Sequence, residues 1–483
     1  MLTTVGGEIR KLEDATVTAI APDGSRIAFV KQRKVWQMGP GGEDAKPLFP
    51  VPGGRGMWSL EWSPDGRWLS YLRRKAGQTE GAVLEAHLPG AGDATTVFED
   101  PRLRAFCWLT PNRLLLDRWE AADRPFSNLW EIDVDPGTIK ARGKPRRLTN
   151  WAGFAIQSMS ASSDGKRLAV TKRQDQSDVF IGELAGNGGR LDHLRRFTSD
   201  DRIDWPGGWS NDSKWLLLQS DRTGNMSIFK QGADSGENPE PLVTNQDDNR
   251  GPLLSPDGQW VLYFAWARST AEVKIGKLMR IPVGGGSPEL ILEAKGLPGS
   301  PQTSNYVIVP TTTGHPAFRC PSRPGAPCVL SEARPNEAVF YSFAPVPGNA
   351  KSEIFRIPVK DPNYLAWDLS PDGSSIAYFE KDVRSASIHV RELGRGTTRD
   401  ITIPGWVELL TLGWSADGKS LFATNFAPAG SSLLHVTLDG NYRVLYKAAK
   451  ELELPKPSPD GRHLAIGEVV SASNVWLIEG LPQ

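Results

Sequence analysis

Short apolar stretches separated by turn-forming residues recur along the whole chain. Stretches such as MWSLEW (57–62) and LTLGW (410–414) precede a turn, and stretches such as KWLLLQS (214–220) and QWVLYFAW (259–266) follow one. They are short, rich in β-branched and aromatic residues, and bounded by turn formers, which is typical of strands. The pattern therefore predicts an all-β chain.

The turn between the paired stretches has a recurring sequence. Pro favours its first central position, Asp caps its own backbone, and Gly accepts a positive φ. The repeats are APDG (21–24), SPDG (63–66), a degenerate LTPN (109–112), SSDG (162–165), SNDS (210–213), SPDG (255–258), SPDG (370–373), SADG (415–418) and SPDG (458–461).

Third and fourth apolar stretches, such as SIHVREL (387–393) and PEPLVTN (239–245), complete each unit of 40–50 residues. Four strands at this spacing are typical of a β-propeller blade. The interval between the turns at 255–258 and 370–373 is longer, and it predicts one blade without the turn sequence. Its expected strands lie near residues 317–320, 328–332, 338–343 and 353–358.

The two ends of the chain suggest ring closure. The last unit ends with NVWLIEG (474–480) and supplies three strands, so we expect GEIRKLE (7–13) to add the fourth. The prediction is a single closed propeller over residues 1–483 with ten blades. Nine blades, or two smaller propellers, are the alternatives. Residues 296–335 are expected to hold an irregular insertion and the cysteine-containing part of the unmarked blade.

The chain has 56 basic and 56 acidic residues. A net charge of zero removes the basis for broad binding to nucleic acid or anionic membranes. No apolar run approaches 18 residues, and the start lacks the apolar segment of a signal peptide. We expect no membrane contact by this segment. The location is cytoplasmic, or extracytoplasmic if the segment belongs to a membrane-tethered sensor. Ring closure favours a monomer, because it leaves no free strand edge.

Three cysteines are present, and Cys320 and Cys328 flank a Pro/Gly turn. Opposed positions on a hairpin can reach disulfide distance. Two buried thiols on paired strands are the alternative interpretation. A disulfide would imply an oxidising compartment. Two cysteines without nearby histidines make a poor zinc site.

Sequence motifs for catalysis are absent. The chain has no G-x-S-x-G segment, no ligand-spaced histidine pair and no D-x-D-x-D-G calcium loop. Turn capping accounts for the aspartates of the repeated turns. We therefore expect no catalytic residue, no metal and no cofactor.

Aromatic and charged residues on the predicted innermost strands are the candidate ligand-binding set. Innermost strands line the channel of a propeller, and aromatics beside charges there suit a protein, a peptide or a small polar ligand. Packing in the core or channel is the alternative role for each. The candidates are Trp58, Glu61, Asp204, Trp205, Arg250, Trp367, Asp368 and Lys456.

The repeated S-P-D-G turn, together with SDRTGNMSIFK (220–230), resembles the TolB-like propeller repeat over nearly the whole chain. This resemblance implies the fold and leaves the function open, because the repeat serves scaffolds, peptidase-gating domains and sensors.

Four further segments resemble the C-terminal propeller of bacterial serine/threonine kinases and winged-helix regulators. That resemblance implies a sensor or interaction domain of a signalling protein, with a covalently linked or separate kinase or regulator module. The alternatives are a hydrolase or lyase acting at the propeller axis, and the gating domain of a peptidase. The four segments are FRCPSRPGAPCVLSE (318–332), WDLSPDGSSIAYF (367–379), GWSADGKSLFAT (413–424) and SNVWLIEGL (473–481).

Overall fold

The computed structural model confirms an all-β chain built of antiparallel sheets. Its described part contains 37 strands and no helix, and therefore no helix that is long and apolar enough to cross a membrane. The described residues are 11–51, 57–73, 82–121, 124–151, 155–200, 202–234, 238–267, 275–296, 316–361, 365–380, 386–427 and 430–481.

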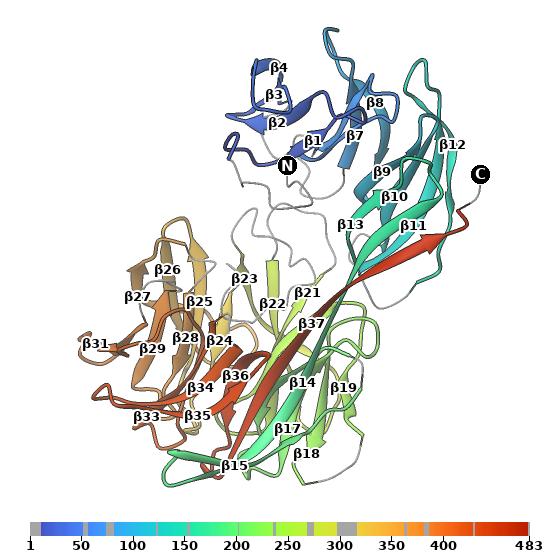
Figure 1. The fold of residues 1–483 in the computed structure, drawn as a ribbon. Helices are drawn as coiled ribbons and strands as arrows, with labels where there is room; N and C mark the ends of the chain where they lie inside the picture. The colour runs from blue at the N-terminus through green and yellow to red at the C-terminus, as the bar shows by residue number, and fades with distance from the viewer. Residues whose placement is uncertain are drawn as a thin grey trace. The chain divides into compact units, whose positions relative to one another are not determined.

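The chain divides into two compact units (Figure 1). Unit 1 comprises Met1–Gln174 and Ala472–Gln483, and unit 2 comprises Asp175–Ser471. The chain passes between the units twice, within two long strands, β14 (Arg167–Ala185) and β37 (His463–Glu479).

Unit 1 contains three four-stranded sheets and part of a fourth. The strands are β1 (Thr18–Ile20), β2 (Ile27–Lys31), β3 (Lys34–Met38) and β4 (Lys46–Pro50); β5 (Met57–Trp62), β6 (Leu69–Arg73), β7 (Ala82–His87) and β8 (Thr95–Asp100); β9 (Leu103–Thr110), β10 (Arg113–Ala121), β11 (Arg124–Val134) and β12 (Ala141–Arg147); and β13 (Ala155–Ala161) beside the first half of β14 and the second half of β37.

The core of unit 1 lies between successive sheets. One cluster joins the first and second sheets around Phe49 and Tyr71, and another joins the second and third sheets around Leu84 and Leu116. A third cluster joins the third sheet to β13 and β14. Alternation along each strand supplies one apolar row for each of these layers.

Unit 2 contains five complete sheets and the rest of the sheet that the units share. The strands are β16 (Asp204–Trp209), β17 (Trp215–Ser220), β18 (Ser227–Gly232) and β19 (Glu240–Val243); β20 (Asp248–Leu254), β21 (Trp260–Trp266), β22 (Ile275–Pro282) and β23 (Glu289–Lys295); β24 (Ala317–Arg319), β25 (Cys328–Arg334), β26 (Glu337–Phe343) and β27 (Ser352–Pro358); β28 (Leu365–Leu369), β29 (Ser375–Glu380), β30 (Ser387–Glu392) and β31 (Thr398–Thr402); β32 (Leu409–Trp414), β33 (Ser420–Ala427), β34 (Gly430–Thr437) and β35 (Tyr442–Ala448); and β36 (Glu451–Pro457) with the first half of β37, the second half of β14 and β15 (Arg190–Arg196).

The six sheets of unit 2 pack in a cyclic order. Each sheet shares an apolar cluster with the next one along the chain, and the shared sheet has clusters with both the β32 sheet and the β16 sheet. The order thus returns to its start, as in a closed propeller. Residues that share these clusters are Leu217 and Tyr263; Phe264 and Leu330; Phe340 and Ile376; Phe379 and Leu412; Phe422 and Leu464; and Ala465 and Trp209.

The pairing of the last strands differs from the prediction. We expected residues 7–13 to complete the last blade, but β37 pairs with β14, and β14 pairs with β15. Residues 7–10 lie outside the described part of the chain. The physical reason is the length of β14 and β37, which continue from one unit into the other and so provide the outer strands that the last blade needs.

The strands of the blade without the turn sequence are confirmed. The expected stretches correspond to the four strands of the β24 sheet, which pair in chain order. Residues 297–315 of the expected insertion lie outside the described residues. Elsewhere the repeated turn has the geometry its residues favour: Ser370 Oγ donates to Asp372 Oδ1 at 2.6 Å, and Gly373 has a φ of 76°.

Candidate functional site

In a propeller, the first strand of each blade is the innermost one and faces the central axis. Three charged residues lie at equivalent places at the ends of such strands in unit 2. Asp368 and Lys456 lie two positions before Ser370 and Ser458, and Arg319 lies two positions before Pro321. At the same position in β32, Gly413 allows the main chains of β32 and β36 to approach closely. A Cβ atom on Gly413 would lie 2.4 Å from the carbonyl oxygen of Pro455. The main chains of β32 and β36 are thus tightly packed at this point.

Arg319 and Asp368 form an ion pair between the neighbouring strands β24 and β28. Arg319 Nε lies 2.8 Å from Asp368 Oδ1. Arg319 Nη1 donates a hydrogen bond to the carbonyl oxygen of Phe318, the preceding residue, at 2.8 Å. The second carboxylate oxygen of Asp368 accepts the main-chain N–H of Trp414 at 3.0 Å. Both charged groups of this pair are therefore committed to protein partners.

Lys456 lies on a strand that is not adjacent to the two strands of this ion pair. Its strand, β36, is separated from β24 by two sheets in either direction around the cycle, so the two strands face each other across the axis. Burial, together with the positive charge of Arg319, lowers the pKa of Lys456 to about 8, and the negative charge of Asp368 opposes this change. The Lys456 ammonium is therefore close enough to Arg319 and Asp368 to interact with their charges.

The Lys456 ammonium makes no hydrogen bond or ion pair with a residue that the structure describes. The side chain is half-buried. A partly buried ammonium group without a carboxylate partner is costly for a fold, because burial disfavours the charged form. Together, Arg319, Asp368 and Lys456 define what we call the axial cluster.

The other candidates in unit 2 have mainly packing roles. Trp367 is 1% exposed and donates its indole N–H to Ser331 Oγ at 2.8 Å. Trp205 is 3% exposed and packs against Gly467. Asp204 is fully buried and pairs with Arg222 at 2.9 Å, and burial raises its pKa above the ordinary value. None of these three side chains is accessible to a ligand in this structure.

Arg250, the remaining candidate in unit 2, is half-buried and lies 3.5 Å from the Asp248 carboxylate. In unit 1, Trp58 donates its indole N–H to the carbonyl of Arg104 at 3.0 Å. Glu61 accepts the main-chain N–H of Trp108 at 3.3 Å, and burial raises its pKa to about 7. Glu61 thus has in unit 1 the same contact that Asp368 has in unit 2.

Arg319 is the member of the axial cluster that was missing from the sequence prediction. Its blade lacks the repeated turn, so the blade supplied no marker from which to count. The signal was nevertheless present: Arg319 precedes Pro321 by two residues, just as Asp368 precedes Ser370. Aligning Pro321 with Ser370 would have placed Arg319 at the position that Asp368 occupies in the next blade.

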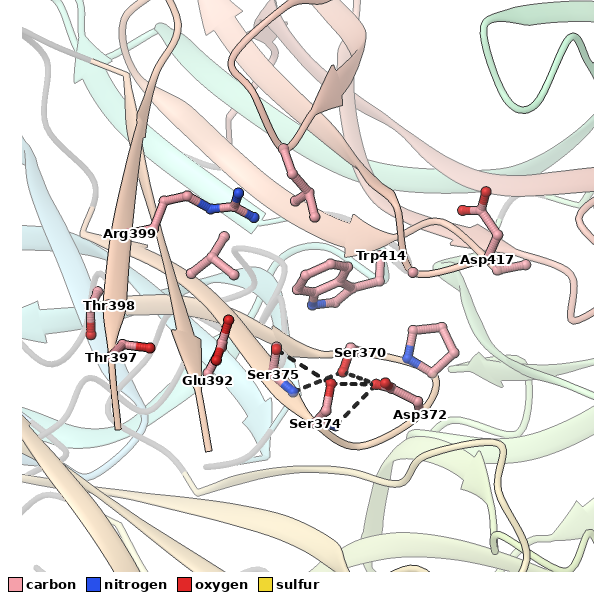
Figure 2. A pocket seen from close by; sticks show the side chains of 15 residues that line it. Ser370, Asp372, Ser374, Ser375, Glu392, Thr397, Thr398, Arg399, Trp414 and Asp417 are labelled. Atoms are coloured by element: carbon pink, nitrogen blue, oxygen red, sulfur yellow. Dashed lines mark hydrogen bonds between the residues drawn. The ribbon is translucent and has the colours of Figure 1, made fainter. Parts of the chain in front are cut away.

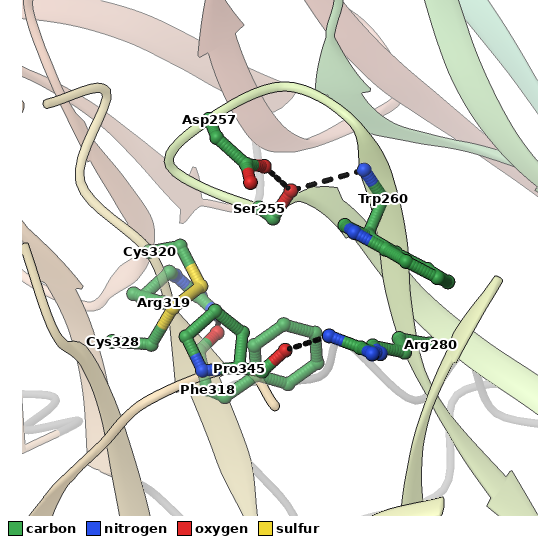
Figure 3. The surroundings of a disulfide bond; sticks show 9 residues. All are labelled: Ser255, Asp257, Trp260, Arg280, Phe318, Arg319, Cys320, Cys328 and Pro345. Carbon is green, nitrogen blue, oxygen red and sulfur yellow. Dashed lines mark hydrogen bonds between the residues drawn. A yellow bond between two sulfur atoms is a disulfide. The ribbon is translucent and has the colours of Figure 1, made fainter. Parts of the chain in front are cut away.

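A disulfide bond fixes the strand that carries Arg319 (Figure 3). Cys320 at the end of β24 is bonded to Cys328 at the start of β25, with the two Cα atoms 4.3 Å apart. Cys320 directly follows Arg319 in the chain, and Figure 3 shows both beside the bond. The cross-link therefore holds the short β24 strand, and with it the backbone of Arg319, against β25.

A separate pocket of about 350 Å³ lies between the β28 and β32 sheets (Figure 2). Its lining includes Asp372, Asp417, Arg399 and the largely buried Trp414. A hydrogen bond from Ser370 holds the pKa of Asp372 below its ordinary value. Both aspartates belong to repeated turns and accept hydrogen bonds from the serines there. Their position is thus explained by turn formation.

The described histidines are dispersed over the blades. His389 Nδ1 lies 2.7 Å from Asp400 Oδ1, and His435 Nε2 lies 2.7 Å from Ser420 Oγ. Within the described ranges, no group of three or more His, Cys, Asp and Glu side chains is arranged to hold a metal ion.

No protein-family model matches the chain. It is 25% identical over 290 residues to the uncharacterized protein Atu1656 of Agrobacterium fabrum, which covers 57% of this chain and 84% of that protein. It is 30% identical over 122 residues to the Tol-Pal system protein TolB of Wolinella succinogenes, which covers 25% of this chain and 27% of TolB. The chain therefore matches about a quarter of the length of TolB.

Among solved structures, the chain is similar to the putative TolB from Agrobacterium tumefaciens, with a TM-score of 0.46 and 17% identity over 62% of this chain and 99% of that one. It is also similar to an oligogalacturonate lyase, with a TM-score of 0.33 and 12% identity over 86% of this chain and 98% of that one. The sequence match to TolB confirms that the repeat is TolB-like. Neither structural similarity assigns a function.

Proposed function

We propose that the chain is a non-catalytic binding propeller and that the axial cluster of unit 2 binds a carboxylate group of a peptide or small polar ligand. The observation that carries the proposal is the Lys456 ammonium, which interacts with the charges of Arg319 and Asp368 but has no hydrogen-bond partner among the described residues. A carboxylate is the complementary group, because it would supply the charge and the acceptors that the ammonium lacks.

The charges of the axial cluster favour an anion over a cation. Arg319 and Asp368 neutralise each other at 2.8 Å, which leaves the single positive charge of Lys456. Enclosure by protein strengthens an ion pair formed there, because the local dielectric is lower than that of water. Binding of an anion would also raise the pKa of Lys456, since a neighbouring negative charge favours the ammonium form.

A sensor role belongs to the same proposal. A rigid closed cycle of blades can present the occupied or empty axis to a second protein. In this view a kinase or regulator module, on the same or another polypeptide, responds to occupancy of the axial cluster. The resemblance of four segments to the propellers of bacterial kinases and regulators supports this view.

The test is calorimetric titration of the protein with N-acetylglutamate, with the neutral N-acetylglutamine amide as the matched probe. We expect binding of the carboxylate, no binding of the amide, and at least a tenfold loss of affinity in Lys456→Met. Lys419→Met, which removes an exposed lysine from a turn, is the control and should bind like the wild type. Equal affinity of the wild type and Lys456→Met would refute the axial site.

Catalysis at the axis is the alternative function. The lowered pKa of Lys456 favours it, because a general base works best when its pKa lies near the operating pH. The two hypotheses differ in what happens to a bound ligand. A non-catalytic propeller returns it unchanged after long incubation, as judged by mass spectrometry. Turnover that Lys456→Met abolishes would replace the binding hypothesis by the enzymatic one.

A further inference from the structure

The sheet of β13, β14 and β37 in unit 1 has a free edge among the described residues. The other three sheets of unit 1 each have four strands. Residues 472–479 of β37 lie beside β14 on one side, whereas β36 pairs only with residues 464–469 of β37, in unit 2. No described strand pairs with the other side of residues 472–479, so the described part of this blade has three strands.

The free edge exposes apolar side chains. Val475 is 75% exposed, Trp476 is 52% exposed and Leu477 is 60% exposed. The strand itself is anchored, because Ile478 packs in the cluster of the third sheet and Lys172 lies over the Trp476 ring at 4.3 Å. A well-held strand that exposes three consecutive large apolar residues is typical of an interaction surface.

The edge also lacks the features that normally prevent pairing with another chain. Exposed edges usually carry lysine, proline or a bulge that blocks a further strand. The segment ASNVWLIE (472–479) contains no lysine and no proline, and Glu479 is its single charge. No described strand uses the N–H and C=O groups on the outer side of this segment, so they can accept another strand.

We propose that this edge pairs with the same edge of a second copy of the chain, antiparallel and centred on Trp476. In this register Val475 lies opposite Leu477 of the second copy, and Leu477 lies opposite its Val475. Trp476 lies opposite its own counterpart, and Glu479 lies opposite Ser473. Val475, Trp476 and Leu477 thus face apolar residues, Ile478 faces Asn474, and no like charges meet.

A two-fold axis is the commonest symmetry of homodimers, and it requires this kind of self-complementary patch. The sequence favoured a monomer because a closed ring has no edge. That argument does not extend to residues 472–479, whose outer side is unpaired among the described residues. The proposed dimer is independent of the axial cluster, since it uses residues of unit 1.

The test is sedimentation of the full chain over a range of protein concentrations. We expect the wild type to reach about 106 kDa, twice the 52.8 kDa of one chain. Val475→Lys and Leu477→Glu should each remain monomeric, because each places a charge opposite an apolar residue. Ile354→Lys, on the outer strand β27 where Ile354 is 40% exposed, is the matched control and should dimerise like the wild type.

The double variant V475K/L477E tests the register. Each lysine would then face a glutamate of the second copy, so we expect the dimer to return. Circular dichroism melting of all variants checks that the fold is retained. A wild type that stays monomeric would overturn the proposal, and so would single variants that still dimerise. A double variant that remains monomeric would overturn the pairing about Trp476.

Discussion

Trp209 donates its indole N–H to the main-chain carbonyl of Lys456 at 2.8 Å, although 247 residues separate the two in sequence. The same contact joins Trp414 to the carbonyl of Asp368 at 3.2 Å, between blades that are adjacent in the chain. Asp460 N also donates to Ser213 Oγ at 3.2 Å, between the turns of the same two distant blades. The sheet that contains β36 thus contacts the β16 sheet in the same way as the β28 sheet contacts the β32 sheet, which follows it in the chain.

Trp209→Phe tests this closure. The substitution keeps an aromatic ring but leaves the Lys456 carbonyl without its donor, so we expect a loss of about 1–2 kcal/mol in the free energy of unfolding. Urea denaturation measures the loss. Trp414→Phe is the internal comparison and should cost a similar amount. A Trp209→Phe protein as stable as the wild type would contradict closure through this contact.

Lys456→Met should stabilise the fold at neutral pH. The folded-state pKa of about 8 lies below the ordinary 10.5, so below pH 8 the folded protein carries the full cost of keeping this partly buried ammonium charged. We expect a gain of about 2 kcal/mol at pH 7. Between pH 8 and 10.5 the folded wild type loses this proton first, its stability rises, and the gain shrinks. Urea denaturation at pH 7 and pH 10 measures the difference in stability between the variant and the wild type. A variant that is less stable than the wild type at pH 7 would mean that Lys456 stabilises the fold.

Asp368→Asn should strengthen anion binding while weakening the fold. Without the carboxylate, Arg319 loses its counter-ion at 2.8 Å and the axis gains one positive charge. We expect roughly a fivefold tighter binding of N-acetylglutamate at pH 6. Titration calorimetry measures this against Asp372→Asn, which alters a turn aspartate in the same sheet. Weaker binding by Asp368→Asn would mean that the carboxylate itself positions the ligand.

Glu61→Gln should remove a pH dependence of stability. Burial raises the folded-state pKa of Glu61 from 4.5 to about 7, so the folded state holds this proton more tightly. Stability from this group is fully present below pH 4.5 and is lost as pH rises to 7, by about 3 kcal/mol at most. Relative to the wild type, the variant should become steadily more stable over that window. Parallel pH profiles of the two proteins would argue against a buried, protonated Glu61.

Removal of the disulfide by Cys320→Ser with Cys328→Ser should lower the free energy of unfolding by about 2 kcal/mol, because the cross-link restricts the unfolded chain. A thiol reductant should destabilise the wild type by the same amount and leave the variant unchanged. Cys107 is a free cysteine and remains in both proteins, which controls for other thiol effects. Equal sensitivity of the two proteins to reductant would contradict this assignment.

Local pattern was sufficient to predict the strands and the blades. Alternation and turn chemistry located even the β24 sheet, which lacks the repeated turn. Local pattern could not predict which distant strand completes a blade, because β14 and β37 look like ordinary strands over any short window. The axial candidates show the same limit: Asp368 and Lys456 were found because they lie on predicted innermost strands, but the burial of Asp204 and Trp205 depends on blades far away in the sequence.

The pairing of β37 with β14 also sets an order of events during synthesis. The hairpin of β14 and β15 leaves the ribosome about 280 residues before β36 and β37. The side of β14 that pairs with β37 therefore stays without its partner strand while most of unit 2 is synthesised. Contacts of such large sequence separation form slowly. We therefore expect the nascent chain to depend on chaperones that shield strand edges until the final segment emerges.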